Sequence, residues 1–393
     1  MKRTRLSLII AAAALALALG SCTEGPVGIF ASVAAETDIN KWATDEFKGT
    51  SPNFVAKAGS TYYAGVGGLW KRNIGDSSWT TVNVSLPSLG TGNYAAVSGI
   101  TIGSTMYVLF ADADTKAKLG IYSSTNGSTW TEVDVATAVI TKNELSHLMT
   151  DGNDLFAVTA QVTETDGEKI TKHSVYRSIG GAAFAALDGT SLVNADIGLP
   201  TSIVNDGGTY YLSAGEYIVT GTAGSMTVTN PATTSAFGSA VIVNGLVFFT
   251  GRDGKIYNDD ASVASGVFSD YNDRDYSFGI PVVVSTGNPT TQTTLLVPSR
   301  AYPQGSERDQ GLGYLEFDAT GFGTTSAAIA DTSRRVSTLN NYFITLDGKS
   351  VKQFIVFTEG DARRLYALTD GDGLWMNFFD GGTPGSWTGW RRE

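Results

Sequence analysis

The sequence predicts an all-β protein, a seven-bladed β-propeller of four-stranded antiparallel blades. Its composition, with 46 glycines, 10 prolines and 17% charged residues, favours short strands joined by tight turns. A unit made of an apolar segment, a glycine-containing turn and an aromatic or aliphatic pair recurs seven times in residues 51–393. The turn glycines run from Gly59 to Gly360 with a mean spacing of about 50 residues, which is typical of propeller blades.

Each unit carries further strand signals in a constant order. The pairs that mark the second strand are Tyr62-Tyr63, Met106-Tyr107, Leu155-Phe156, Tyr210-Tyr211, Val247-Phe248, Leu295-Leu296 and Leu365-Tyr366. The third strand is marked by Leu69-Trp70, Ile121-Tyr122, Val175-Tyr176, Tyr217-Ile218, Ile256-Tyr257, Tyr314-Leu315 and Leu374-Trp375. The fourth opens on Trp79, Trp130, Phe184, Met226, Phe268, Phe322 and Trp387.

A four-stranded meander has two faces and cannot bury both by itself. Radial stacking of neighbouring blades covers these faces and leaves only short sheet edges. We therefore interpret the recurrent aromatic residues as packing between blades. The last interval between turn glycines is the longest, and we interpret its extra length as an insertion over residues 323–350.

The first 22 residues have the features of a bacterial lipoprotein signal. Lys2, Arg3 and Arg5 precede an apolar run, residues 6–19, that is too short to span a bilayer comfortably. Leu19-Gly20-Ser21-Cys22 resembles the lipobox of bacterial lipoproteins, and Cys22 is the only cysteine. The resemblance implies that residues 1–21 are a signal peptide and that Cys22 is acylated. Residues 22–50 then form a tether that precedes the propeller domain, residues 51–393.

The lipid anchor predicts a location in the cell envelope. Acyl chains contribute about 0.8 kcal/mol per buried CH₂, so two or three of them, such as palmitate, hold a protein on a membrane. Thr23 follows the cysteine in place of an aspartate, which favours the outer membrane over the inner one and leaves periplasmic and surface faces open. A net charge of −11 disfavours binding to nucleic acid.

Residues 120–133, GIYSSTNGSTWTEV, form the clearest copy of the outer hairpin of a blade. The Asn126-Gly127 pair suits a tight turn because both residues tolerate positive φ. The stretch SSTNGSTW resembles the Asp-box of sialidase-like propellers, with Thr125 where the aspartate stands in that family. The chain as a whole resembles the lipid-anchored β-propellers of spirochaetes and similar bacteria. In those families the box is a structural turn, so the resemblance implies a fold and not an activity.

No recognisable catalytic set accompanies this fold. A sialidase would need an arginine triad, a tyrosine with a glutamate partner and an acidic proton donor, and the first unit has no Arg-Ile-Pro segment. Only His147 and His173 are available for a histidine-based zinc site. We expect no enzyme activity and no cofactor. Carboxylates at Asp270, Asp273 and Asp275 give a weak indication of Ca²⁺, with solvated loop charge as the alternative.

The loops that join second and third strands are the candidate partner-binding elements. Such loops gather on one face of a propeller, and loops on a rigid scaffold are common binding elements. Solvent-exposed loops without a ligand remain the alternative. The candidate residues are Asp112, Asp114, Glu164, Asp166, Arg252, Arg300, Tyr302, Glu307, Arg308 and Asp309.

These observations predict a non-enzymatic envelope lipoprotein that binds a protein or glycan partner, or that serves as a scaffold subunit. A glycan-active propeller enzyme of the glycosidase or lyase type is the first alternative, and carboxylates converging on the central channel would support it. A purely structural envelope protein without a ligand pocket is the second. Whether residues 28–35 add a strand that clasps the ring, and what the oligomeric state is, stay open.

Overall fold

The structure is a computed structural model that describes residues 45–135, 140–165, 168–187, 198–229, 237–251, 255–260, 262–265, 276–285, 293–301, 313–318, 346, 349–380 and 388–393. Cys22, the lipobox and residues 28–35 lie outside these ranges. No helix within them is long and apolar enough to cross a membrane.

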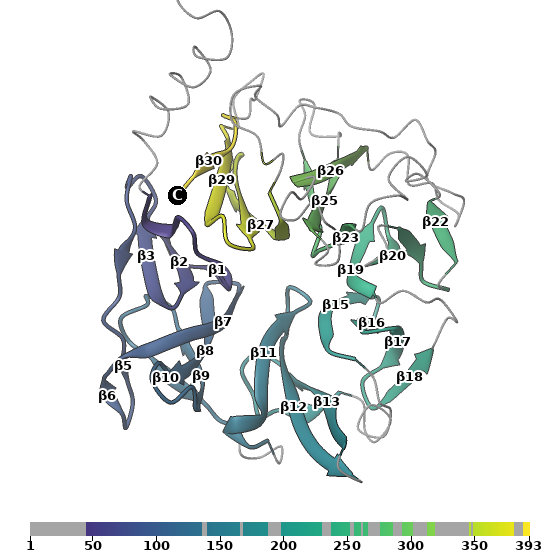
Figure 1. Ribbon diagram of the computed structural model, residues 1–393, viewed down its shortest axis with the longest axis horizontal. Coiled ribbons are helices and arrows are strands. Elements are labelled where there is room, and N and C mark those ends of the chain that lie inside the picture. Colours follow the sequence, from purple (N-terminus) through teal and green to yellow (C-terminus); the bar gives the residue numbers. More distant parts are fainter. Residues whose placement is uncertain are drawn as a thin grey trace, which may run out of the picture.

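The described residues are almost entirely β-strand, arranged as a ring of sheets (Figure 1). The first three sheets comprise β1 (Phe54–Ala58), β2 (Thr61–Val66), β3 (Gly68–Asn73) and β4 (Thr80–Thr81); β7 (Tyr94–Ile102), β8 (Thr105–Asp112), β9 (Lys118–Ser124) and β10 (Thr131–Val133); and β11 (Leu145–Thr150), β12 (Leu155–Thr165), β13 (Glu168–Ser178) and β14 (Ala185–Ala186). A small hairpin of β5 (Ser85–Leu86) and β6 (Gly90–Thr91) and the short 3₁₀ helices η1 (Asp45–Phe47) and η3 (Lys142–Glu144) lie between sheets or before them.

The ring continues with four more sheets. They comprise β15 (Pro200–Asp206), β16 (Thr209–Ala214), β17 (Tyr217–Thr222) and β18 (Ser225–Thr229); β19 (Phe237–Val243), β20 (Leu246–Gly251), β21 (Ile256–Asn258) and β22 (Val263–Ser265); β23 (Tyr276–Phe278), β24 (Val282–Ser285), β25 (Thr293–Ala301) and β26 (Gly313–Asp318); and β27 (Val351–Glu359), β28 (Ala362–Thr369), β29 (Leu374–Phe379) and β30 (Arg391–Arg392).

The predicted number of seven four-stranded blades is wrong. The described strands form six four-stranded antiparallel blades, each a meander in chain order. In the sheet between β19–β22 and β27–β30, β23 and β24 lie end to end along one edge of β25, and β26 pairs with its other edge. Pro281 separates β23 from β24, and proline has no N–H to donate to a ladder. The unit before the longest interval therefore departs from the repeat.

The paired residues predicted for second and third strands are confirmed in every sheet. Of the predicted openings of the fourth strand, Trp79, Trp130 and Phe184 directly precede β4, β10 and β14, and Met226 lies in β18. Phe268 is a wrong prediction because β22 begins earlier, at Val263. The fourth strand of the last blade begins at Arg391, so the predicted opening at Trp387 is wrong, and Phe322 lies outside the described ranges.

The second strand of each sheet is buried on both faces. In β8, residues 106–111 are all buried, and alternate side chains enter different cores: Val108 packs with the first sheet, and Leu109 packs with the third. Seven such apolar clusters among the described residues each join two successive sheets, including the last sheet to the first. In each recurrent pair, one residue therefore packs against the preceding sheet and the other packs against the following sheet.

The turn between β9 and β10 is closed by its own side chains. The Asn126 side-chain oxygen accepts hydrogen bonds from the backbone N–H groups of Ser128 and Thr129, both at 2.9 Å, and Ser124 Oγ accepts one from Gly127. The Tyr63 hydroxyl, from the neighbouring sheet, donates to the Asn126 carbonyl at 2.7 Å. Gly127 has φ +68°, and a Cβ there would overlap the Tyr63 ring, so glycine is required. The hairpin therefore links two blades.

Polar and aromatic contacts close the ring between the last and first sheets. The Arg72 guanidinium, on β3, forms a buried ion pair with the Glu393 carboxylate and donates to the Tyr366 hydroxyl at 2.7 Å. Trp79 Nε1 donates to the same carboxylate at 2.9 Å. Phe47, from η1, packs edge-on against the rings of Trp70 and Trp79 and joins the same cluster. Both ends of the described chain thus stabilise one interface.

The Arg72→Met variant tests this closure. Removing this cation leaves the buried Glu393 carboxylate with the Trp79 N–H and with Arg391 Nε at 3.4 Å. The free energy of unfolding should therefore fall by about 3 kcal/mol, the lower end of the cost of breaking a buried pair. The matched control is Glu132→Gln, which breaks the exposed pair with Lys142 and should cost no more than about 1 kcal/mol. Urea denaturation of both variants measures the difference. Equal losses would show that the buried pair does not hold the ring closed.

Candidate functional site

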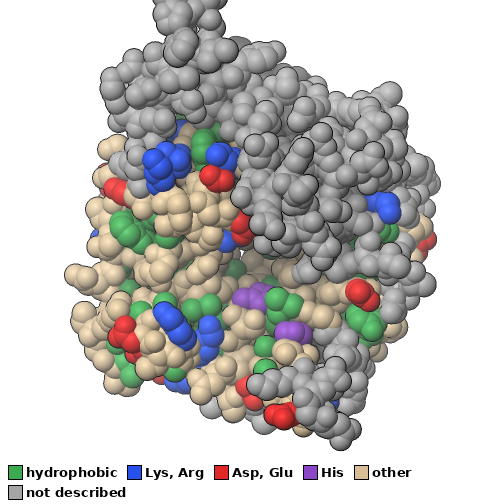
Figure 2. All heavy atoms as spheres, viewed as in Figure 1, with side chains coloured by type: hydrophobic (Ala, Val, Ile, Leu, Met, Phe, Trp, Pro, Cys, Tyr) green, Lys and Arg blue, Asp and Glu red, His purple; other side chains and the backbone are tan. Residues whose placement is uncertain are grey.

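A cavity of about 430 Å³ lies at the centre of the ring. Its lining comes from the innermost strands β1, β7, β11, β15, β19 and β27 and from the segment between β23 and β24. Figure 2 shows an opening at the centre of the viewed face, with histidine side chains beside it. Because each blade contributes residues, the site exists only in the assembled ring.

Five innermost strands are irregular at the cavity wall. Their pairing with the second strand shifts by one residue near the first residues of the strand, in β7, β11, β15, β19 and β27. Such a bulge bends a strand and redirects a side chain. The residues that follow the shifts are all polar and line the cavity: Ser98, His147, Ser202, Ser239 and Gln353.

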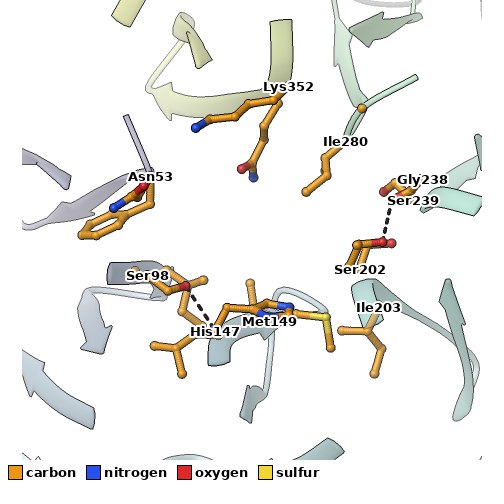
Figure 3. A pocket seen from close by; sticks show the side chains of 18 of the residues that line it. Asn53, Ser98, His147, Met149, Ser202, Ile203, Gly238, Ser239, Ile280 and Lys352 are labelled. Atoms are coloured by element: carbon orange, nitrogen blue, oxygen red, sulfur yellow. Dashed lines mark hydrogen bonds between the residues drawn. The ribbon is translucent and has the colours of Figure 1, made fainter. Parts of the chain in front are cut away.

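Several of these polar groups bond to the neighbouring blade. Ser98 Oγ accepts a hydrogen bond from the backbone N–H of Leu148 at 3.0 Å, and Ser202 Oγ accepts one from Ala240 at 2.6 Å. Thr201 Oγ1 donates to the Gly238 carbonyl at 2.6 Å, and Asn53 Nδ2 donates to the Ala96 carbonyl at 3.1 Å. These bonds link successive innermost strands, so the cavity wall is held in one geometry (Figure 3).

His147 is a neutral part of this wall. Its Nδ1 lies 3.2 Å from the Ser146 hydroxyl, and the ring also bonds to the Pro200 backbone carbonyl. Burial lowers the pKa of His147 to about 4, so the imidazole carries no proton charge at pH 7. These two contacts fix the orientation of the His147 imidazole in the cavity wall. Within the described ranges no three His, Cys, Asp or Glu side chains gather as a metal site would require.

The cavity wall carries a charged group as well as apolar side chains. Lys352 extends into it from the top of the view in Figure 3, towards Asn53. Met149, Ile203 and Ile280 present apolar side chains to it. Among the described lining residues, Lys352 is the one with a formal charge at pH 7, and none is aspartate or glutamate. The cavity therefore combines an ammonium group with an apolar wall.

The loop candidates that the structure describes, Asp112, Asp114, Glu164 and Arg300, are not part of this lining. Asp112 ends β8, and the backbone and hydroxyl of Thr115 together with the backbone of Asp114 bond to its carboxylate and lower its pKa. It therefore caps its own turn. Glu164 is exposed near the end of β12, and Arg300 lies on β25 opposite Ser277. The remaining candidates fall outside the described residues: Cys22, Asp166, Arg252, Tyr302, Glu307, Arg308, Asp309, and Asp270, Asp273 and Asp275 for Ca²⁺.

The described loop candidates share one end of the ring with the bulges. The antiparallel register pairs the first residues of each innermost strand with the last residues of the second strand, as in Leu145 with Thr159 and Tyr94 with Asp112. Asp112, Glu164 and Arg300 all lie at the ends of second strands. The described loop candidates thus lie at the same end of the ring as the bulges, and sequence analysis did not identify the cavity.

A sequence signal for the cavity residues was present. Ser98, His147 and Ser202 each stand five residues before a turn glycine, at Gly103, Gly152 and Gly207. Ser98 follows the mainly apolar residues 94–97, whereas His147 and Ser202 each follow another polar residue, Ser146 and Thr201. The constant distance from the turn glycine is therefore the signal that these three residues share.

Comparison with known proteins supports the architecture. No protein-family model and no curated protein sequence matches this chain. The structure is similar to YCF48 bound to a D1 peptide, with a TM-score of 0.50 and 13% identity over 83% of this chain and 91% of that one. The fold is a β-propeller. It is also similar to an ancestral GH74 enzyme, with a TM-score of 0.52 and 12% identity, covering 85% of this chain and 48% of that one. At these identities the similarity concerns the fold alone.

The neutral state of His147 predicts a pH dependence of the propeller's stability. The unfolded chain binds a proton near pH 6.5, whereas the folded chain does so only near pH 4, so stability should fall as the pH drops through this window. Between pH 7 and pH 5, the wild type should lose of order 1 kcal/mol more than His147→Gln does. Urea denaturation at both pH values measures this. An identical pH dependence in the two proteins would contradict the assignment of His147 as a neutral, half-buried side chain.

Proposed function

We propose that this protein is a non-enzymatic, lipid-anchored β-propeller of the bacterial cell envelope that binds a protein or glycan partner through the cavity-bearing end of its ring. The observation that carries the proposal is the central cavity, whose wall is held by hydrogen bonds between blades. A rigid concave site with a few polar groups and an apolar wall is the usual form of a binding site.

The loops at the same end extend the proposed binding surface. The hairpin of β12 and β13 is paired over eleven residues, whereas β11 pairs only with residues 155–159 and β14 only with residues 176–177. Residues 160–165 and 168–173 therefore continue beyond the blade as a two-stranded ribbon that includes exposed Glu164. A partner larger than the cavity would contact this ribbon as well.

A glycan-active enzyme is the alternative function. The ancestral GH74 enzyme indicates that this architecture is compatible with such chemistry. Glycoside hydrolysis commonly uses a pair of carboxylates. The cavity lining that the structure describes offers hydroxyls, amides, an imidazole and an ammonium group but no such pair. We therefore propose binding rather than hydrolysis at this cavity.

The Ile280→Trp variant tests binding at the cavity. The Ile280 side chain points into the cavity, and an indole there should occupy much of its volume (Figure 3). Cross-linking on intact cells that produce the full chain should show partner capture reduced at least tenfold. The matched control is Ile74→Trp, where the same change is made on an exposed side chain outside the cavity. Undiminished capture by Ile280→Trp would place the partner elsewhere.

The proposed anchor has its own test at Cys22. Replacing Cys22 with alanine removes the proposed acylation site, so palmitate incorporation should be lost and the protein should move from the membrane fraction to the soluble fraction. Metabolic labelling and fractionation measure both effects. A variant that keeps its label and its membrane association would rule out this lipidation site.

A further inference from the structure

Gln353 lies on β27 at a point where its backbone is fixed by the neighbouring sheet. It follows the register shift after Val351 and forms a parallel bridge with Ile280. The Ile280 N–H donates to the Lys352 carbonyl at 3.0 Å, and the Phe354 N–H donates to the Ile280 carbonyl at 3.1 Å. These two bonds lie on either side of Gln353, so its half-buried side chain lines the cavity from a rigid backbone.

The Gln353 carboxamide keeps its hydrogen-bonding capacity for a ligand. In the part of the chain that the structure describes, no hydrogen bond joins this side chain to another group. It can donate two hydrogen bonds through Nε2 and accept two through Oε1. Because a half-buried amide without a partner costs free energy, a ligand that bonds to both ends of the carboxamide is favoured.

Two other lining residues, Ser98 and Asn53, have capacity left after their bonds within the ring (Figure 3). Ser98 Oγ accepts the Leu148 N–H, and its own O–H bonds to none of the described residues. The Asn53 amide donates to the Ala96 carbonyl, and its Oδ1 accepts no hydrogen bond from the described residues. The cavity therefore offers donors at Gln353 and Ser98 and acceptors at Gln353 and Asn53.

This set of donors and acceptors matches a main-chain amide. A peptide unit presents one N–H and one C=O, and a carboxamide side chain can bond to both. None of the described lining residues is Asp or Glu, and His147 is neutral because its pKa is about 4. Lys352 already takes part in another interaction within the protein. A neutral ligand is therefore favoured over a charged one.

A peptide fits the described wall better than a sugar does. A sugar would gain from an exposed aromatic ring, whereas Phe54 and Phe278, the phenylalanines of the described lining, are each only 3% exposed. Hydroxyl groups of the wall bond to the next blade. The lining side chains of Val97, Ile100 and Ile280 are partly exposed and suit an apolar side chain of a peptide.

We propose that the cavity binds a main-chain amide of a partner protein through Gln353, with Asn53 and Ser98 as further hydrogen-bonding groups. An apolar side chain next to this amide packs on the apolar part of the wall. This inference rests on the proposed binding function and specifies its ligand as a neutral peptide segment. The volume of about 430 Å³ accommodates a peptide unit with its side chain. A small free amide has the same chemistry, and the experiment below separates these two sources.

The test compares a peptide amide with an ester of the same shape. The two probes are N-acetyl-leucine N-methylamide and N-acetyl-leucine methyl ester. Isothermal titration with the full chain in detergent should show the amide binding at least tenfold tighter. The ester lacks one N–H, so it leaves an acceptor in the cavity without a donor.

Two further probes examine the side chain and the source of the amide. N-acetyl-glycine N-methylamide should bind about tenfold more weakly than the leucine amide, since it lacks the apolar side chain. The other probe is a capped, neutral pentapeptide with leucine at its centre. If it binds tenfold tighter than the leucine amide, the source is a protein chain, and equal affinities indicate a small free amide.

Variants connect the preference for the amide to one side chain. Gln353→Met removes the carboxamide at similar length and should abolish the preference for the amide over the ester. Asn83→Met is the matched control, since Asn83 carries an exposed carboxamide outside the cavity, and it should leave the preference unchanged. Because the Gln353 side chain bonds to none of the described residues, its variant should keep the wild-type urea midpoint. An unchanged midpoint separates lost recognition from a folding defect.

Three results would overturn the inference. Equal affinity of the wild type for amide and ester would exclude recognition of the peptide N–H, and so would a preference that survives in Gln353→Met. Absence of binding by every probe would also reject it. The proposed function is judged separately, because reduced partner capture by Ile280→Trp would still support binding at the cavity after such a failure.

Discussion

The burial of each second strand on both faces is the constraint on which this propeller depends. A strand such as β8 sends alternate side chains into two different cores, so it is covered only when a blade packs on each side. Seven apolar clusters satisfy this requirement around the ring. The interface between the last and first sheets adds an ion pair between Arg72 and Glu393, which are 321 positions apart in the chain. Phe47 packs in the apolar cluster at the same interface.

The same ring geometry creates the cavity. Innermost strands converge on the axis, where bulges turn Ser98, His147 and Ser202 inward and let hydroxyl groups bond to the next blade. Closure of the ring and shape of the site are therefore coupled, because the groups that hold blades together also form the wall. The departure from the repeat in the described strands, next to Pro281, places Ile280 beside β27 at the cavity wall, where its backbone bonds to those of Lys352 and Phe354.

Much of the fold was predictable, whereas little of the site was. Pairs such as Tyr62-Tyr63 identified second strands because burial on both faces leaves a local apolar signal. The number of four-stranded blades was wrong because the split between β23 and β24 depends on how they share one edge of β25. Loop charges such as Asp112 were conspicuous in the sequence, but that carboxylate caps its own turn. The lining residues are polar positions in short first strands, and only the constant distance of Ser98, His147 and Ser202 from their turn glycines distinguishes them in the sequence.

The sequence by itself determined the all-β repeat, the positions of second and third strands and the turn at Asn126-Gly127, since each depends on neighbours along the chain. Only the tertiary structure decided the register shifts, the cavity and the contact of Arg72 with Glu393. These features depend on which strand edge meets which, across separations that no local pattern records. A bulge moves a side chain from one face to the other through a one-residue change in pairing, and that pairing is a property of two strands together.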